Sequence, residues 1–390
     1  MIKVDLVYSN YLNSPDGASR FVKTMADMRG LFAEQGIELR VITADLFSKK
    51  EFGDGMKENP SLAKKIVRFI SKYSALVTIL RIKRSTGTLA KRIIQYYENY
   101  QDKGSVIAFQ EGSTAYEFFK KCHPSGQKVL LTMHSNGEMW TMTAQSMPRI
   151  NSVLLKGYRE DFENTLFTNC DEIGFVADTP RKHFCSLYNF PEDKTFFNYN
   201  GIVLKPMPER TKSDTLDLVC VGSLCERKNQ IGILNAIALL PEEVQKKITF
   251  RIVGDGTTRL EAERKAKDLA AKIIFVGSSN HVDKHLQQSN CFVLFSKDEG
   301  LPISIVEGMR SGLPIIGSRI AGIPEQIIEA KTGFVVDLDE HKLAEKLQYC
   351  VNHIDELYDM GKASYEYFLQ KFTIEAMVKK YAEIYRGAME

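Results

Sequence analysis

The stretch 296–325, SKDEGLPISIVEGMRSGLPIIGSRIAGIPE, decides how this chain folds. It continues from the run CFVLFSK at 291–297, which is apolar, rich in aromatic residues and typical of a buried parallel strand. A loop holding Glu299 must follow that strand, and Pro302 suits the first turn of a helix. The spacing then predicts that Glu307 lies on this helix, on the side that can face the same cleft. The free N–H groups at the helix start form an anion site suited to a diphosphate. One carboxylate could then accept hydrogen bonds from sugar hydroxyls while the other binds a ribose diol.

Strand-like and helix-like segments alternate along the whole chain. A first series of strands is expected at 4–9, 39–43, 106–110, 129–134, 173–177 and 195–199. A second series is expected at 217–222, 249–254, 273–277, 291–296, 314–318 and 334–337. This alternation predicts an α/β protein with two doubly wound parallel sheets. The segment KPMPERTKSDT at 205–215 is the best linker, so the predicted domains are 1–205 and 206–372.

At these residues the chain resembles family 4 of the retaining glycosyltransferases, which have the GT-B fold of two Rossmann-like domains and include many bacterial surface-polysaccharide enzymes. The resemblance rests on the pair Glu299 and Glu307, followed in the family's order by SGLPIIGSRIAGIPEQI and TGFVVD. It implies that the strand ends of both domains face one cleft. The donor nucleotide-sugar would bind residues 206–372 and the acceptor residues 1–205. It also implies that the closing helix, 373–390, crosses back onto the first domain.

Two cations follow the strand expected at 217–222. In VGSLCERKNQ, Arg227 and Lys228 lie just beyond the turn at Gly222. Two cations at a strand end can neutralise a diphosphate and stabilise it as a leaving group. Lys228 matches the family's lysine, but Ser223 stands where the family has arginine directly after the glycine. Arg227 is therefore the candidate source of the guanidinium, and the alternative is that both cations are merely solvated at a helix start.

Turn residues complete the donor site that the resemblance implies. The turn VGDG, with Gly254 and Gly256, would line the nucleotide pocket, and the loop after Gly277 would meet the base through backbone groups. The full set of expected donor-binding residues is Glu307, Gly17, Gly222, Gly254, Gly256, Gly277, Gly300, Leu301 and Pro302.

The first domain offers three further positions. Asp16-Gly17-Ala18 resembles the family's glycine-rich loop near the donor phosphates, although Ala18 replaces the usual second glycine and limits positive φ. His134, at the end of an apolar strand, resembles the histidine that the family places near the transferred sugar. The alternative for His134 is a structural histidine with satisfied hydrogen bonds. Asn200-Gly201 matches a turn that borders the cleft.

The segment 59–97 contains nine lysines and arginines and no acidic residue. Its apolar residues recur at helical spacing, which predicts a basic amphipathic helix that includes Leu62, Ile66, Phe69, Ile70, Tyr73 and Val77. Such a helix can lie on an anionic membrane surface, where each nearby cation contributes about 1 kcal/mol. The alternative is a core-facing helix with a solvated basic face. The apolar runs of the chain are broken by charges well short of the roughly 18 residues that a bilayer-spanning helix requires.

Composition excludes several other classes. The net charge of +3 indicates no nucleic-acid partner, and MIKVDLVYSN lacks the basic start and apolar stretch of a signal peptide. Seven scattered cysteines without a CxxC pair fit a reducing cytoplasm. His281 and His285 lack the further ligands of a zinc site. The DxD string at Asp337 and Asp339 follows a strand near the chain's end and is interpreted as a solvated turn, so no metal is expected.

These features predict a metal-independent, retaining glycosyltransferase without a cofactor. It would move a hexose-type sugar from a nucleotide-diphosphate sugar, most simply a UDP-sugar, to a hydroxyl of a glycan or lipid-linked acceptor in polysaccharide or glycolipid synthesis. The expected catalytic residues are Glu299, Lys228, Arg227 and His134. The expected location is the cytoplasm, with attachment to the inner face of the cell membrane through 59–97. Two alternatives stay open: a sugar-nucleotide epimerase of the same architecture, and a non-catalytic partner of another glycosyltransferase.

Overall fold

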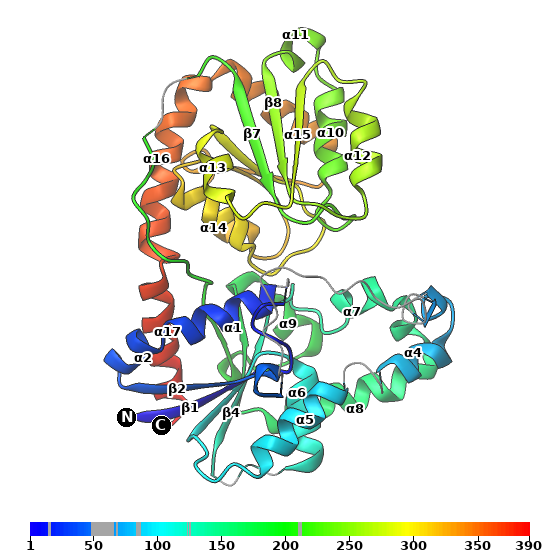
Figure 1. The fold of residues 1–390 in the computed structure, drawn as a ribbon, viewed down its shortest axis with the longest axis vertical. Coiled ribbons are helices and arrows are strands. Elements are labelled where there is room, and N and C mark those ends of the chain that lie inside the picture. Colours follow the sequence, from blue (N-terminus) through cyan, green and yellow to red (C-terminus); the bar gives the residue numbers. More distant parts are fainter. Residues whose placement is uncertain are drawn as a thin grey trace. The chain divides into compact units, whose positions relative to one another are not determined.

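The computed structural model describes residues 1–14, 17–47, 66–67, 69–82, 87–122, 124, 126–209 and 213–390. The chain forms two compact units, which are coloured along the sequence in Figure 1. Unit 1 consists of Met1–Asn198 and Val378–Glu390, and unit 2 of Tyr199–Met377. The sequence placed the boundary at 205, but residues 199–205 bond within unit 2: Arg310 Nη1 donates to the Val203 carbonyl, and Lys205 Nζ pairs with Asp283 at 2.5 Å.

A six-stranded parallel sheet forms the centre of unit 1. Its strands are β1 (Ile2–Val7), β2 (Ile37–Ile42), β3 (Val106–Phe109), β4 (Lys128–Met133), β5 (Glu172–Phe175) and β6 (Thr195–Phe197). They pair in the order β2-β1-β3-β4-β5-β6, so the direction of winding reverses between β1 and β3. The six strands predicted for this sheet are confirmed, with small shifts at their ends.

Helices cover both faces of this sheet. The helices and 3-10 turns of unit 1 before its closing segment are α1 (Gly17–Asp27), α2 (Arg29–Glu34), η1 (Ala44–Phe47), α4 (Ala75–Arg81), α5 (Gly87–Glu98), α6 (Gly112–Lys121), α7 (Thr141–Ser146), η3 (Pro148–Asn151), η4 (Val153–Leu155), α8 (Lys156–Asn169), α9 (Asp178–Tyr188) and η5 (Glu192–Lys194). On one face α6 packs over β3 and β4, and α5 and α8 pack against α6. These three helices lie near one another in Figure 1. The core between them is rich in phenylalanine, because a parallel sheet covered on both faces must be apolar on both faces.

The closing helix α17 (Ile374–Gly387) completes the other face of unit 1. Its Tyr381 and Tyr385 are 1% exposed. The Tyr381 ring lies 5.8 Å from that of Phe21 on α1, and the Tyr385 ring lies 6.5 Å from that of Phe32 on α2. The Thr373 hydroxyl caps the helix by accepting a hydrogen bond from the Ala376 N–H.

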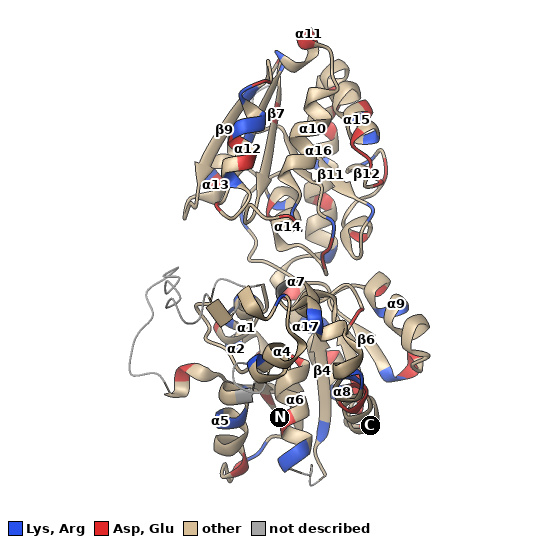
Figure 2. Ribbon diagram, turned by 90° about the vertical axis from the view of Figure 1, so that its right-hand side faces the viewer, with Lys and Arg blue, Asp and Glu red and all other residues tan. Residues whose placement is uncertain are grey.

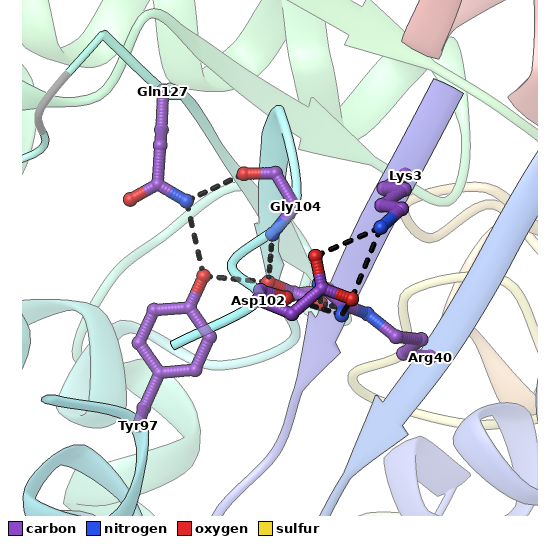
Figure 3. A network of polar contacts seen from close by, with 7 residues as sticks. Lys3, Arg40, Tyr97, Asp102, Gly104 and Gln127 are labelled. Carbon is purple, nitrogen blue, oxygen red and sulfur yellow. Dashed lines mark hydrogen bonds and ion pairs between the residues drawn. The ribbon is translucent and has the colours of Figure 1, made fainter. Parts of the chain in front are cut away.

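A buried polar network ties the edge of unit 1 together (Figure 3). The carboxylate of Asp5, in the middle of β1, pairs with the Arg40 guanidinium of β2 at 2.6 Å and accepts hydrogen bonds from the Tyr97 hydroxyl and the Gly104 N–H. Asp5 is fully buried, and its partners satisfy both of its oxygens. Burial and the Asp5 carboxylate both raise the pKa of Tyr97, so the phenol stays a donor. This network is structural.

Unit 2 has its own six-stranded parallel sheet. Its strands are β7 (Leu216–Val221), β8 (Ile248–Val253), β9 (Lys272–Gly277), β10 (Cys291–Leu294), β11 (Ile315–Ser318) and β12 (Gly333–Val336). The order β12-β11-β10-β7-β8-β9 reverses the winding between β7 and β10. This sheet also matches the six predicted strands. In an open parallel sheet the place of reversal leaves a crevice at the carboxyl ends of the strands, where ligands bind.

The helices of unit 2 also divide between two faces (Figure 1). They are α10 (Gln230–Ala238), α11 (Glu242–Gln245), α12 (Arg259–Ala266), α13 (Val282–Gln287), α14 (Ile303–Arg310), η6 (Ile323–Gln326), α15 (Glu340–Asn352) and α16 (Ile354–Lys371). Helix α10 packs between α12 and α15, and α14 packs on α16. None of the helices within the described residues is both long and apolar enough to cross a bilayer.

The predicted basic amphipathic helix differs from the structure. Residues 59–65, 68 and 83–86 lie outside the described residues. In the part that is described, a turn at 71–73 separates helical residues 66–67 and 69–70 from α4. Ser74 caps α4 by accepting the Val77 N–H, and such local side-chain bonding favours the break over one continuous helix.

Candidate active site

Three charged side chains meet where the winding of unit 2 reverses. Arg227 and Lys228 follow β7, and Glu299 follows β10. Lys228 Nζ lies 2.6 Å from Glu299 Oε1, and Arg227 Nη1 lies 3.0 Å from Glu299 Oε2. Glu299 is 8% exposed, so one partly desolvated carboxylate holds two cations at the carboxyl ends of β7 and β10. The structure thus brings together the three charged residues of unit 2 that the sequence selected for catalysis.

The loop after β7 fixes both cations. Lys297 N–H donates to the Arg227 carbonyl at 2.8 Å, and Arg227 Nη1 donates to the Asp298 carbonyl at 2.8 Å, which links the β7 and β10 loops. The Lys228 chain passes over Gly222, where an added Cβ would lie 3.5 Å from Lys228 Cε. The Arg227 guanidinium therefore reaches the loop after β10. Ser223 stands at the position where the family has arginine.

Close backbone approach explains two of the glycines. Gly254 ends β8 with φ +139°, and a Cβ there would lie 2.0 Å from the Gly222 carbonyl oxygen. A Cβ on Gly256 would lie 2.1 Å from the Leu224 carbonyl oxygen. The Gly254 N–H donates to the Gly277 carbonyl at 2.8 Å, so the ends of β7, β8 and β9 form one compact rim. Side chains larger than hydrogen would separate these turns.

The turn Gly300, Leu301 and Pro302 leads from β10 into α14. Pro302 is the N-cap residue rather than a residue of the first turn, because its ψ of 117° is extended. Glu307 lies one turn inside α14 and is partly exposed. The first N–H groups of α14 point toward the carboxyl edge of the sheet, as the proposed anion site requires.

Two buried amides that the sequence did not single out for this purpose support that turn. Asn200 Nδ2 donates to the Leu301 carbonyl at 3.4 Å, and Gln326 Nε2 donates to the Pro302 carbonyl at 3.2 Å. Gln326 is fully buried and Asn200 is 6% exposed. Asn200 lies in the turn expected to border the cleft, whereas the role of Gln326 was missed. In the sequence Gln326 stands between Glu325 and Ile327, and no local pattern distinguished it.

Unit 1 has a polar cluster at its own point of reversal, between β1 and β3. Glu111, which follows β3, accepts hydrogen bonds from the Ser9 N–H at 2.9 Å, from the Ser9 hydroxyl and from the Thr114 hydroxyl at 2.5 Å. These bonds join the loops after β1 and β3. Glu111 was not among the predicted site residues. The signal that could have revealed it is that Glu111 directly follows the apolar strand expected at 106–110.

His134 follows β4 and lies beside this cluster. Its Nε2 is 3.1 Å from Gln110 Oε1, and its ring lies 4.9 Å from the ring of Phe21. Gln110 is 2% exposed and orients the imidazole from the neighbouring strand. Gly17 is exposed at the start of α1, with open space around its Cβ position, while Asp16 lies outside the described residues. His134 and Gly17 belong to unit 1 and the other predicted site residues to unit 2.

The DxD acids serve local structure. Asp337 pairs with Arg319 at 2.9 Å and with Lys342 at 2.5 Å, and Asp339 caps α15 by accepting the His341 N–H. The hydrogen bonds from Lys342 and Arg319 hold the pKa of Asp337 below its usual range. Among the described residues, no group of three or more His, Cys, Asp or Glu side chains is arranged to hold a metal ion.

Solved structures share the fold of this chain. The complex of Anabaena Alr3699/HepE with UDP superimposes with a TM-score of 0.69 at 14% identity, covering 99% of this chain and 100% of that one. The sucrose-phosphate synthase of Thermosynechococcus elongatus gives a TM-score of 0.72 at 17% identity, covering 99% of each chain. At these identities the likeness defines the fold, which is GT-B with two six-stranded parallel sheets.

Sequence relatives narrow the class. Residues 206–367 match the family model for glycosyl transferases group 1. The chain is 26% identical over 266 residues to the N-acetyl-alpha-D-glucosaminyl L-malate synthase of Bacillus anthracis, covering 66% of this chain and 67% of the relative. It is 37% identical over 138 residues to the Vi polysaccharide biosynthesis protein VipC/TviE of Salmonella typhi, covering 33% of this chain but 23% of the relative. The match to the group 1 glycosyltransferase model thus covers the part of the chain that holds Arg227, Lys228 and Glu299.

Proposed function

We propose that this protein is a retaining glycosyltransferase that moves a hexose-type sugar from a UDP-sugar to a hydroxyl group of a glycan or lipid-linked acceptor in polysaccharide or glycolipid synthesis. The observation that carries the proposal is the pairing of Lys228 and Arg227 with Glu299 at the reversal point of unit 2. Support for UDP comes from the UDP complex of Anabaena Alr3699/HepE. Support for a lipid-linked acceptor comes from a Campylobacter jejuni relative, 33% identical over 134 residues, whose name describes a transferase acting on an undecaprenol-linked glycan.

The residues of unit 2 bind the donor. The first N–H groups of α14 and the two cations receive the diphosphate, and Glu307 binds the ribose diol. The glycine rim formed by Gly222, Gly254 and Gly277 lets the nucleotide approach the backbone. Glu299 then accepts hydrogen bonds from the sugar hydroxyls. Before the donor binds, the Glu299 carboxylate pairs with both Lys228 and Arg227. This pairing holds the two positive charges close together in the absence of a ligand.

The chemical step needs no protein nucleophile. The bond between the anomeric carbon and the phosphate oxygen breaks, and the acceptor oxygen bonds to that carbon on the same face. The acceptor proton passes to the departing phosphate oxygen, so charge and atoms balance. Lys228 and Arg227 stabilise the negative charge that develops on the diphosphate, and each such contact contributes about 2.7–4 kcal/mol in the transition state.

The cluster of unit 1 serves the transferred sugar and the acceptor. His134 forms one hydrogen bond with a hydroxyl of the transferred sugar. Gln110 holds the imidazole ring of His134 in place. Glu111 positions the loops after β1 and β3, because its carboxylate accepts hydrogen bonds that join them. We further propose that the reaction is metal-independent and takes place in the cytoplasm at the inner face of the membrane.

The test begins with a thermal-shift screen of the full chain against nucleoside diphosphates and sugar nucleotides. A ligand present at 100 times its dissociation constant raises stability by about 2.7 kcal/mol. The stabilising sugar nucleotide is then incubated with acceptors, and the anomeric configuration of the product is determined by NMR. Retained configuration and full activity in EDTA are expected. Conversion of the free donor without transfer would identify an epimerase. Donor binding without turnover would identify a non-catalytic partner. Loss of activity in EDTA that Mn²⁺ restores would identify a metal-dependent enzyme.

A further inference from the structure

One side of unit 1 exposes large apolar side chains. In residues 66–80, Phe69 is 63%, Tyr73 66%, Leu76 68% and Leu80 60% exposed. The rings of Phe69 and Tyr73 lie 5.4 Å apart, and both face solvent. Single exposed apolar residues are ordinary, but a group of them marks an interaction surface.

Polar groups occupy the inside of the same segment. Ser71 and Thr78 are fully buried. The Thr78 hydroxyl donates to the Ser71 carbonyl at 2.9 Å, and Arg81 Nη1 donates to the Ser71 hydroxyl at 3.0 Å. These bonds hold the turn at 71–73 against α4 and keep the leucines of α4 outside. The segment therefore buries two hydroxyl side chains while four of its large apolar side chains stay in water, an arrangement that water alone does not favour.

A second apolar group comes from a distant part of the sequence. In η4, Val153 is 86% and Leu154 71% exposed. Helix α4 packs on η3 and η4 through a small core of Ile82, Met147, Ile150 and Leu155. Arg159 secures this turn by donating to the carbonyls of Ile150 and Ser152. The two apolar groups thus belong to one packed substructure of unit 1.

Both contributing stretches lack acidic residues. Residues 59–97 contain none, and neither do residues 139–159, which include Arg149, Lys156 and Arg159. Helix α4 accordingly shows no red in Figure 2. A surface that combines exposed leucine and aromatic side chains with an excess of cations matches an anionic lipid bilayer. The apolar groups enter the acyl boundary, and the cations meet the headgroups.

We propose that the exposed side chains of Phe69, Tyr73, Leu76, Leu80, Val153 and Leu154 form a docking surface for anionic membranes. These apolar side chains supply insertion, and the exposed cations Lys72 and Arg149 supply attraction. This inference deepens the proposed location at the membrane. The vesicle-binding assay contains no sugar nucleotide, so failure of this inference is distinguishable from failure of the proposed transfer reaction.

The experiment is co-sedimentation of the full chain with vesicles of phosphatidylglycerol and phosphatidylcholine, compared with phosphatidylcholine alone. The wild type is expected to bind the mixed vesicles, to bind less as salt rises and to ignore the neutral vesicles. Two double variants, L76S/L80S and V153S/L154S, should each lower the partition coefficient at least about tenfold. Leu187→Ser, on α9 and 52% exposed, is the matched control and should bind like the wild type.

Each variant is checked for folding by its thermal transition and for transfer to a soluble acceptor, which should be unchanged. Absence of wild-type binding to anionic vesicles at low salt would overturn the proposal. So would normal binding by V153S/L154S, because the two apolar groups would then not act as one surface. Self-association in sedimentation velocity that both double variants abolish, without vesicle binding, would assign the surface to a second copy of the chain.

Discussion

Glu299 holds the positions of two cations that come from a different loop. Because Lys228 is mostly buried against it, the ammonium cannot simply turn to solvent, whereas the nearby Lys297 is half-exposed and pairs with the exposed Glu226 at 3.7 Å. Two lysines at the same edge of the sheet therefore differ in what their removal should do. This contrast supplies a matched pair of variants.

We expect Lys228→Ala to lower kcat about a hundredfold or more, because its partner in the transition state is the charge on the leaving diphosphate. Lys297→Ala should leave kcat within about twofold, since an exposed ion pair contributes little. Steady-state kinetics and circular dichroism on both variants provide the measurement. A folded Lys228→Ala enzyme with normal turnover would remove this lysine from catalysis.

Glu307→Ala should weaken binding of bare UDP as well as of the complete donor, because the lost contacts are to ribose. Hydrogen bonds to a charged group contribute about 1.5–3 kcal/mol, or about a 10- to 150-fold change in affinity. Isothermal titration calorimetry measures this, with the exposed Glu345→Ala on α15 as the control. Unchanged UDP affinity would place Glu307 outside the nucleotide site.

At the scale of elements, an ion-pair cluster attaches the segment after Tyr199 to unit 2. Asp283 at the start of α13 contacts Arg310 of α14 at 2.7 Å and Lys205 at 2.5 Å. Burial alone would raise the pKa of Asp283, but Lys205 and Arg310 outweigh it and the pKa is lowered. A lowered pKa means that the folded state gains stability from the ionised carboxylate. That gain is present above the unfolded pKa and is lost as pH falls through the folded pKa.

Asp283→Asn should therefore destabilise unit 2 by about 1 kcal/mol at pH 7, a value kept small because the carboxylate is partly exposed. The difference from wild type should be smaller at pH 3 than at pH 7, because the stability that the ionised carboxylate provides is lost as pH falls through the lowered folded pKa. Urea unfolding followed by circular dichroism at both pH values tests this. An equal difference at pH 3 and pH 7 would mean that shape rather than charge stabilises the contact.

At the scale of the whole molecule, the chain returns at its end to the unit where it began. The tyrosines of α17 fill space between α1 and α2, so the fold of unit 1 depends on residues that follow all of unit 2 in sequence. The single tryptophan, Trp140, lies in unit 1 and reports on that unit alone.

Tyr381→Ala should destabilise unit 1 by about 3–5 kcal/mol, the usual cost of emptying a large aromatic site in a core. The Trp140 fluorescence transition should move to lower denaturant concentration by the corresponding amount. Tyr358→Ala, at an exposed site on α16, should leave that transition in place. If both variants gave the same Trp140 transition, α17 would contribute nothing to the core of unit 1.

The sequence by itself determined the two sheets, all twelve strands and the charged residues that meet at the candidate site of unit 2. Local information suffices there, because a buried parallel strand must be continuously apolar and the turn after it must carry the polar groups. The sequence did not determine which side chains contact one another in the folded chain. Strand order decides these contacts. It lets Arg227 and Lys228 share Glu299, it lets Gln326 support the turn before α14, and it lets Glu111 join two loops. Strand order brings together residues that lie far apart in the chain.

The basic segment shows the same limit. Helical periodicity predicted one amphipathic helix, whereas Ser71 and Ser74 break it and turn its leucines outward. Only tertiary structure placed Val153 and Leu154 in the same substructure as α4, because packing through Ile82 and Ile150 joins stretches about seventy residues apart. Periodicity records which side chains share a face of one element. Which face is buried is decided by what the rest of the chain packs against it.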